Sequence, residues 1–353
     1  MTAAKTPDAQ AVPPLLQVDD LRVEFDTYGG SVKAVRGVSF SVAAGKTLAI
    51  VGESGCGKSV TVQSLMGLTP MPPGRITSGR ARLRGVDILG RTEIDGREIR
   101  GREIGMIFQD PMTSLNPTMT IGRQIAETLE VHRGWTRQRA LARAVELLDM
   151  ARIPEAAQRA GQYPFEFSGG MLQRAMIAMA IACEPALLIA DEPTTALDVT
   201  IQAQVLDLMS DLQRDIGTAI ILITHDLGVV ARMADDVVVM YAGQVAEQGS
   251  VDDVFYRSAH PYMLGLRAAM PSNTSDRSHR LLPIEGSPPD LFSPPVGCAY
   301  AARCPHAMRI CSMRDPDPFT LAAGHTARCW LHADKAPRVT QLSYAEAAPG
   351  VQA

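Results

Sequence analysis

Apolar residues occur along the chain in two patterns, one of short continuous runs and one of longer segments with helical spacing. Continuous runs, which are typical of strands buried in a parallel sheet, lie at 47–51, 104–108, 186–190, 219–224 and 237–241. Segments that predict helices lie at 60–66, 120–131, 136–150, 168–183 and 201–212. Further strands are expected at 15–25 and 34–42 and a short strand pair at 79–88, whereas 91–103 is polar and charged. This order predicts an α/β fold with a mainly parallel sheet and an antiparallel strand subdomain at the start.

The segment 52–59 fits the phosphate-binding pattern G-x-x-x-x-G-K-[ST] and lies between an expected strand and an expected helix. That context distinguishes a phosphate loop from a chance glycine-rich turn. Glycines let backbone N–H groups turn toward phosphate oxygens, and the helix N-terminus adds its positive dipole end. Lys58 is expected to reach the β- and γ-phosphates and Ser59 to bind Mg²⁺. The expected nucleotide-binding residues of this loop are Gly52, Ser54, Gly55, Cys56, Gly57, Lys58, Ser59 and Val60.

Polar residues follow two of the expected strands. Asp191 comes directly after the run 186–190, as does the carboxylate that helps hold Mg²⁺ in phosphate-loop enzymes. Glu192 is placed to orient and deprotonate an attacking water. His225 follows the run 219–224 and should lie on the same sheet edge as the phosphates. A strand-terminal acidic pair also occurs in solvated turns, but the phosphate loop favours the catalytic interpretation.

Two weaker signals also bear on a nucleotide. Ser168, Gly169 and Gly170 open a helix and would expose N–H groups at its positive end, although such a start is also a common helix cap. An aromatic residue near the loop would stack on the adenine ring. Phe25 is the first choice and Tyr28 the alternative, although an aromatic residue in a strand more often belongs to a core.

Composition limits the class of protein. With 353 residues the chain can form a large domain with an extension or two domains. Its net charge of −4 gives no reason to expect nucleic acid as a partner. No apolar run approaches the ~18 residues that cross a bilayer, and residues 1–11 lack the apolar core of a signal peptide. We expect a cytoplasmic protein that meets a membrane only through a partner, with a disordered leader at 1–14.

Four of the six cysteines, Cys298, Cys304, Cys311 and Cys329, lie near the C-terminus, after a proline-rich segment. Their spacing matches neither close-spaced zinc pairs nor a ferredoxin run. From spacing alone they predict a metal site of four cysteines, with Zn²⁺ and iron–sulfur equally open. The alternative is four unrelated buried thiols, since free cysteine is often a core residue. Cys183, on an apolar helix face, is expected in the core.

Taken together, the motifs over about 15–270 resemble the nucleotide-binding subunits of ABC transporters. The remaining matches are Gln109 to the Q-loop, Ser168, Gly169 and Gly170 with Gln173 to the signature sequence, 196–198 with Asp198 to the D-loop, and His225 to the switch histidine. The resemblance implies a head-to-tail dimer in which each ATP lies between one subunit's phosphate loop and the other's signature helix, so that Ser168 and Gly170 would act on the partner's nucleotide. It also implies that Ser59, Gln109 and Asp191 serve Mg²⁺, that Glu192 activates water, and that His225 fixes the γ-phosphate.

The amino-acid sequences of segments 109–117, 191–200 and 224–230 resemble, more narrowly, those of the D-type ATPase of oligopeptide, dipeptide and nickel importers. That resemblance implies a heterodimer with an F-type ATPase subunit rather than a homodimer. It further implies two membrane permeases, an extracytoplasmic solute-binding protein, and a peripheral place on the cytoplasmic face of the membrane. Members of this branch carry a similar cysteine-rich tail with a [4Fe–4S] cluster, which favours iron–sulfur over zinc here.

The expected organisation is a leader at 1–14, an ATPase domain at 15–270 with a helical subdomain at about 110–165, and a linker with a cysteine-rich extension at 271–353. Two other classes of function are alternatives. A non-transport ABC ATPase would usually carry coiled-coil insertions or a second cassette, and neither pattern occurs. A redox-regulated iron–sulfur module would place the function in the tail. The transported solute is not specified by these residues.

Overall fold

The computed structural model describes residues 13–89, 93–195, 197–270 and 283–337. Its strands are β1 (Leu16–Thr27), β2 (Gly30–Val42), β3 (Thr47–Val51), β4 (Gly74–Leu83), β5 (Val86–Asp87), β6 (Ile104–Ile107), β7 (Leu187–Asp191), β8 (Ala219–Ile223), β9 (Asp236–Tyr241), β10 (Gln244–Ser250), β11 (Phe319–Ala322) and β12 (His325–Ala327). Its helices are α1 (Lys58–Leu65), α2 (Glu93–Ile99), α3 (Pro111–Ser114), α4 (Ile121–Arg133), α5 (Arg137–Met150), α6 (Ala156–Arg159), α7 (Gly169–Ala180), α8 (Val199–Ile216), α9 (Leu227–Met233), α10 (Val251–Tyr256), α11 (Pro261–Ala268) and α12 (Arg309–Met313).

Two sheets organise these elements. The larger has the strand order β11-β12-β10-β9-β3-β8-β7-β6, and its strands from β9 to β6 run parallel. The smaller, antiparallel sheet has the order β2-β1-β4-β5. The predicted α/β fold, with a mainly parallel sheet and an antiparallel subdomain at the start, is therefore confirmed.

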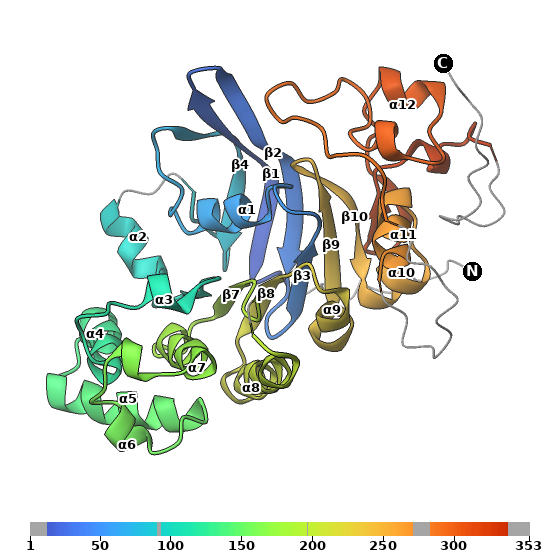
Figure 1. Ribbon diagram of the computed structural model, residues 1–353. Coiled ribbons are helices and arrows are strands. Elements are labelled where there is room, and N and C mark those ends of the chain that lie inside the picture. Colours follow the sequence, from blue (N-terminus) through green and yellow to red (C-terminus); the bar gives the residue numbers. More distant parts are fainter. Residues whose placement is uncertain (1–12, 90–92, 196, 271–282, 338–353) are drawn as a thin grey trace, which may run out of the picture.

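The central strands are buried on both faces, which explains their continuous apolar runs. In β7, Leu188 and Ala190 belong to a core shared with α4, α5, α7 and α8. Leu187 and Ile189 belong to a second core, shared with α1 and the antiparallel sheet. Because side chains alternate between faces along a strand, β6, β7 and β8 contribute to both cores, whereas β3 and β9 contribute to the second core and to a third that includes α9 and α11. Figure 1 shows the helical group on one side of the sheet and β1, β2 and β4 on the other.

Several elements differ from the prediction. The polar segment at 91–103 contains the short helix α2, and β4 begins at Gly74 rather than at residue 79. The strands β10, β11 and β12 and the helices α10 and α11 were not predicted. Across the described ranges, no helix combines the length and the apolar character needed to cross a membrane.

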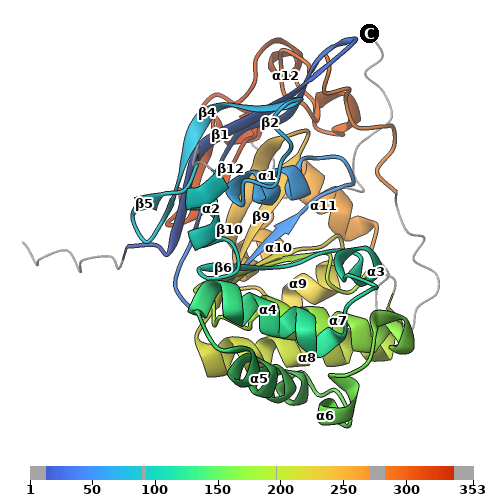
Figure 2. The same cartoon turned by 90° about the vertical axis from the view of Figure 1, so that its left-hand side faces the viewer.

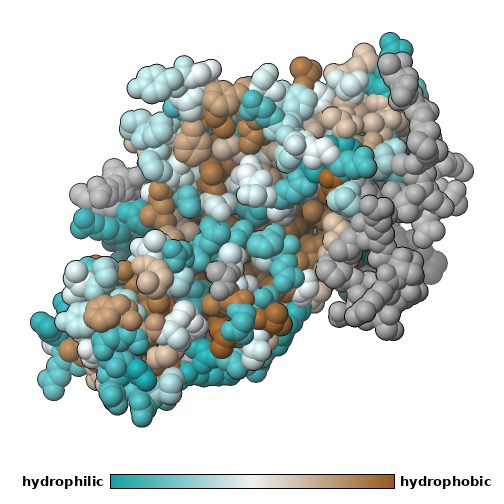
Figure 3. Space-filling model, in the orientation of Figure 1, coloured by the Kyte–Doolittle hydropathy of each residue, from teal (hydrophilic) through white to brown (hydrophobic). Residues whose placement is uncertain are grey.

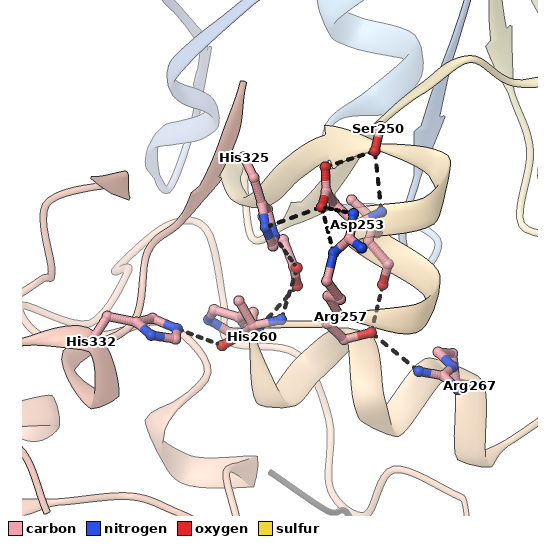
Figure 4. Close-up of polar contacts among 11 residues, drawn as sticks. Ser250, Asp253, Arg257, His260, Arg267, His325 and His332 are labelled. Carbon is pink, nitrogen blue, oxygen red and sulfur yellow. Dashed lines mark hydrogen bonds and ion pairs between the residues drawn. The ribbon is translucent and has the colours of Figure 1, made fainter. Parts of the chain in front are cut away.

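The C-terminal extension joins the main sheet, since β12 pairs with β10 and β11 with β12. The fully buried Glu247 of β10 carries much of this contact. Its carboxylate accepts hydrogen bonds from the backbone N–H groups of Ala259 and His260, at 2.8 and 2.9 Å, and lies 2.9 Å from His325 Nε2. Figure 4 shows His325 and His332 reaching from the extension toward Asp253 and His260. His332 Nε2 lies 2.8 Å from the backbone oxygen of Ala259.

His260 makes stability depend on pH. Burial, together with the charge of His332, lowers the pKa of His260 from 6.5 to about 4. The unfolded chain therefore binds a proton more readily, and stability is lost as pH falls from 6.5 toward 4, by up to about 3 kcal/mol. The ring also caps α11, because Nδ1 accepts from Tyr262 N–H at 3.1 Å. Asparagine caps helices without titrating.

We therefore expect His260→Asn to flatten the fall in stability between pH 6.5 and 4, while both proteins keep similar stability near pH 7. Thermal or urea unfolding of the two proteins across this range measures the difference. An identical pH dependence in the variant would contradict the role given to His260.

Candidate functional site

The glycine loop occupies the predicted position between a strand and a helix, since β3 ends at Val51 and α1 begins at Lys58. Its backbone passes so close to neighbouring segments that two of its glycines have no room for a side chain. A Cβ atom on Gly52 would lie 2.2 Å from Met240 O, and one on Gly57 would lie 2.5 Å from Ala34 O. Both residues also have positive φ, 151° and 98°. Packing as well as backbone conformation therefore requires glycine there.

Two loop side chains already have partners. The buried Lys58 donates from Nζ to the backbone oxygens of Gly52 and Glu53, at 2.8 and 3.0 Å. Ser59 Oγ donates to Asp191 Oδ1 at 3.0 Å. Asp191 lies on the same face of β7 as Ile189, which is the face that packs toward α1, so alternation along the strand brings it to Ser59. Burial raises the pKa of Asp191, although the Ser59 hydrogen bond opposes the shift.

Glu192 is the centre of a second polar group at this sheet edge. Its Oε2 accepts from Gln109 Nε2 at 3.0 Å and from Thr195 Oγ1 at 2.9 Å, and its Oε1 lies 3.5 Å from His225 Nδ1. These residues follow β6, β7 and β8, whose carboxyl ends meet at one edge of a parallel sheet. The His225 side chain is 64% exposed and so remains accessible to a ligand. The structure thus brings the predicted catalytic residues together.

The residues of the predicted signature sequence lie elsewhere. Ser168 is the N-cap of α7 and its Oγ accepts from Met171 N–H at 3.4 Å, while Ser168 and Gly169 are exposed. Figures 1 and 2 place α7 in the helical group, apart from α1. A Cβ atom on Gly170 would lie 2.9 Å from Ile201 Cγ2, so the start of α7 packs closely on the start of α8.

Gln173 does not share that exposure. It is only 2% exposed, so it does not belong to the surface formed by Ser168 and Gly169. The sequence held a signal for this, because Gln173 lies three and four positions before Met176 and Ile177 on the core face of α7. Asp198 is the N-cap of α8 and accepts from the N–H groups of Thr200 and Ile201. The neighbouring residue of the D-loop prediction, Ala196, lies outside the described residues.

The aromatic candidates differ in their surroundings. Phe25 is partly buried at the end of β1 and packs against the core of the antiparallel sheet. Tyr28, in the turn that follows, is fully exposed. Val60 is partly buried against the same core as Phe25. Cys56 is buried and its backbone oxygen accepts from Gly243 N–H at 3.0 Å, which fits a residue that acts through its backbone.

The four C-terminal cysteines gather in one part of the extension. The pKa of Cys304 is raised to about 12, mainly by burial and to a smaller extent by the nearby thiols of Cys329, Cys298 and Cys311. Burial likewise raises the pKa of Cys329 to about 12 and that of Cys298 to about 11.

In the parts of the chain that the structure describes, however, no three His, Cys, Asp or Glu side chains are placed to hold a metal ion. The predicted metal site is therefore not formed in this arrangement of the side chains. Cys183 is buried in the helical core, as predicted.

Contacts around the loop also involve residues that the sequence analysis missed. Thr195 holds Glu192, Tyr262 Oη accepts from Glu53 N–H at 2.8 Å, and Arg303 pairs with the Glu53 carboxylate. The Thr195 contact was foreseeable, since a threonine three residues after an acidic strand end can reach back to it. The other two join segments more than 200 residues apart in sequence, and no local pattern predicts them.

Comparison with known families gives two matches. Residues 35–195 match the family model described as "ABC transporter". Residues 246–311 match the model described as "Oligopeptide/dipeptide transporter, C-terminal region", a range that begins within β10 and includes Cys298, Cys304 and Cys311. The two models thus cover separate portions of the chain, in the order expected from the motifs.

Curated relatives match most of the chain. The oligopeptide transport ATP-binding protein OppD of Bacillus subtilis (strain 168) is 55% identical over 92% of this chain and 91% of its own length. The dipeptide transport ATP-binding protein DppD of the same strain is 52% identical over 91% of this chain and 96% of its own. Among solved structures, a dimeric post-hydrolysis state of the ATP-binding cassette MJ0796, bound to ADP and Pi, is 25% identical, with a TM-score of 0.60, over 67% of this chain and 98% of that chain.

The packing around Gly52 generates a stability prediction. We expect Gly52→Ala to lower the free energy of unfolding by about 2 kcal/mol or more, because the new methyl group would overlap a backbone oxygen and φ is unfavourable. Gly55→Ala is the matched control. Gly55 also has positive φ, but a Cβ there meets nothing within 4 Å, so we expect a cost of about 1 kcal/mol. Urea unfolding without nucleotide measures both, and the opposite ranking would contradict the packing argument.

Proposed function

Because the chain belongs to the ABC transporter family, in the branch of oligopeptide and dipeptide transport ATP-binding proteins, we propose that it hydrolyses ATP to power import of a peptide or a related small solute. The observation that carries this proposal is the polar group around Glu192. Gln109, Thr195 and His225 surround one carboxylate at the sheet edge where the phosphate loop ends. As an importer ATPase it would lie peripherally on the cytoplasmic face of the membrane.

Each residue of the site has a role that its contacts support. Lys58 and the loop N–H groups would bind the β- and γ-phosphates, for which Lys58 Nζ would exchange its backbone partners for phosphate oxygens. Ser59 and Asp191, already 3.0 Å apart, would hold Mg²⁺ with Gln109, and the ion would neutralise phosphate charge. Glu192 would accept a proton from the attacking water, and His225 would fix the γ-phosphate. Phe25, or Tyr28 in its place, would stack on the adenine.

The second proposal concerns a dimer of ATPase subunits. Ser168 and Gly169 are exposed at the positive end of α7 and lie apart from the phosphate loop of their own chain. Together with Gly170, they would therefore serve the nucleotide of a partner subunit. Family resemblance points to an F-type ATPase as that partner. Asp198 would act mainly by fixing the start of α8, against which α7 packs.

The membrane permeases would dock on the helical subdomain. Exposed apolar side chains gather there in the residues that flank α3 and α7. Phe165 is 70% exposed and stacks on Tyr163 with ring centroids 5.6 Å apart, and Met112 in α3 is also exposed. Figure 3 shows hydrophobic residues among hydrophilic ones over this helical part, at the lower left. Since α3 begins two residues after Gln109, the docking surface would sense the state of the site. A solute-binding protein would complete the transporter.

We expect Glu192→Gln to keep ATP binding and to lower hydrolysis about 10²-fold or more, because the positioned proton acceptor is lost. Glu146→Gln, which changes an exposed glutamate on α5, is the control and should behave as wild type. Phosphate release and ATP binding are measured on the purified transporter. Near-normal turnover in Glu192→Gln would remove the proposed catalytic role.

A last proposal concerns the cysteine-rich extension. Family resemblance and the gathering of four thiols support a [4Fe–4S] cluster on Cys298, Cys304, Cys311 and Cys329. The side chains would have to move from their present positions and lose their protons, because thiolates are the ligands. Zn²⁺ is the alternative metal. In either case the metal would supply folding free energy to the extension.

Protein purified without oxygen should contain about four iron and about four acid-labile sulfide per chain. Cys304→Ser should lose them, whereas Cys183→Ala should not, because Cys183 lies in the helical core. Iron and sulfide assays with visible absorption measure this. One tightly held zinc per chain would keep the site but overturn the cofactor, and no metal would leave four separate buried thiols.

A further inference from the structure

The C-terminal extension contacts the phosphate loop through one ion pair. Arg303 lies immediately before Cys304, and its guanidinium group forms a bidentate ion pair with the Glu53 carboxylate. Nη1 donates to Oε2 at 2.7 Å and Nη2 donates to Oε1 at 3.0 Å. Glu53 is the residue that follows Gly52 in the loop. The extension thus binds, through a residue 250 positions away in sequence, the loop that is expected to hold phosphate.

This pair differs from an ordinary surface salt bridge, which contributes little. The Arg303 side chain is only 6% exposed and that of Glu53 24% exposed. Arg303 also donates from Nε to Glu285 O at 2.9 Å and from Nη1 to Tyr241 Oη at 3.2 Å. Burial by itself would lower the pKa of Arg303, but the hydrogen bonds to Glu53 and Tyr241 outweigh it and raise the pKa. Its position is therefore fixed by the extension and by β9 together.

Glu53 is fixed through its backbone as well. Its N–H donates to Tyr262 Oη at 2.8 Å, and its backbone oxygen accepts from Lys58 Nζ at 3.0 Å. Tyr262 packs against Tyr241 and Tyr300, with ring centroids 4.6 and 5.3 Å apart, and Tyr300 belongs to the extension. The first turn of the loop is therefore held from α11, β9 and the extension at once.

Charge gives this contact a functional meaning. A loop that binds the triphosphate of ATP carries, at Glu53, a carboxylate that would repel the phosphates. Arg303 cancels that charge with a bidentate pair, the geometry in which arginine binds carboxylates most strongly. If Arg303 were lost, the partly buried carboxylate would remain uncompensated beside the nucleotide.

We propose that Arg303 is a positioning residue of the nucleotide site, through which the C-terminal extension neutralises Glu53 and sets the affinity of the phosphate loop for ATP. The proposal rests on the ATPase function proposed above. It adds to that function a residue outside the motifs that mark nucleotide sites, on the segment that carries the cysteines. Arg303 acts through Glu53 and touches neither the substrate nor the reacting atoms.

The test is a double-mutant cycle on the full-length chain in the assembled transporter, read out with a fluorescent ATP analogue and by steady-state ATPase kinetics. We expect Arg303→Ala to weaken ATP binding at least about fivefold and to raise KM with little change in kcat. Arg309→Ala, which removes an exposed arginine from α12 in the same extension, is the matched control and should bind ATP as wild type does. In the background of Glu53→Gln, loss of Arg303 should change affinity by less than about twofold, because no carboxylate remains to be neutralised.

Two results would overturn the proposal: equal affinities for Arg303→Ala and Arg309→Ala, or effects of Arg303→Ala that are the same with and without Glu53→Gln. If circular dichroism shows that Arg303→Ala is unfolded, Arg303→Gln takes its place in the same cycle with the same expected coupling. Failure of the ATPase proposal is recognised separately, because the wild-type transporter would then neither bind nor hydrolyse ATP.

Discussion

Burial of the parallel strands on both faces is the constraint on which the site depends. β7 and β8 supply alternate residues to the first and second cores, and β3 supplies them to the second core and to a third that includes α9 and α11, so a shift by one position would place each side chain in a core that is packed for another. Their carboxyl ends are therefore held in register at one edge. The segments that follow these strands therefore lie close together without any further contact to hold them there. They are the phosphate loop, Asp191 with Glu192, and His225. The polar group around Glu192 is a consequence of how the sheet is packed.

This constraint also explains how far the sequence could predict the molecule. The phosphate loop and the Asp191–Glu192 pair were predictable because each depends on a strand and the few residues after it. The register that brings Gln109 to Glu192 follows from the parallel order of the strands. The burial of Gln173 required only the helical period of α7, which the glycine-rich start obscured. In each of these cases the information is local or follows from regular geometry.

The C-terminal extension is different, because what fixes it is spread along the chain. β11 and β12 have only four and three residues, too few to show a strand pattern, and β12 is recognisable as a strand only beside β10. Glu247 is buried because Ala259, His260 and His325 come together around it. The spacing of these residues in the sequence does not predict that they bind a carboxylate. Arg303 and Glu53 are likewise paired by the packing of distant segments. Such contacts arise from tertiary structure and leave no periodic trace in the sequence.

The place of β12 in the sheet has a consequence for how the chain is made. Until residues 325–327 have left the ribosome, β10 is the edge strand on its side of the sheet. The backbone groups that pair with β12 are then unpaired, and Glu247 lacks its contact with His325. Open strand edges invite pairing with other chains. A message cut short after α11, or a protease that removes the extension, would therefore release a protein prone to aggregate rather than a smaller working ATPase.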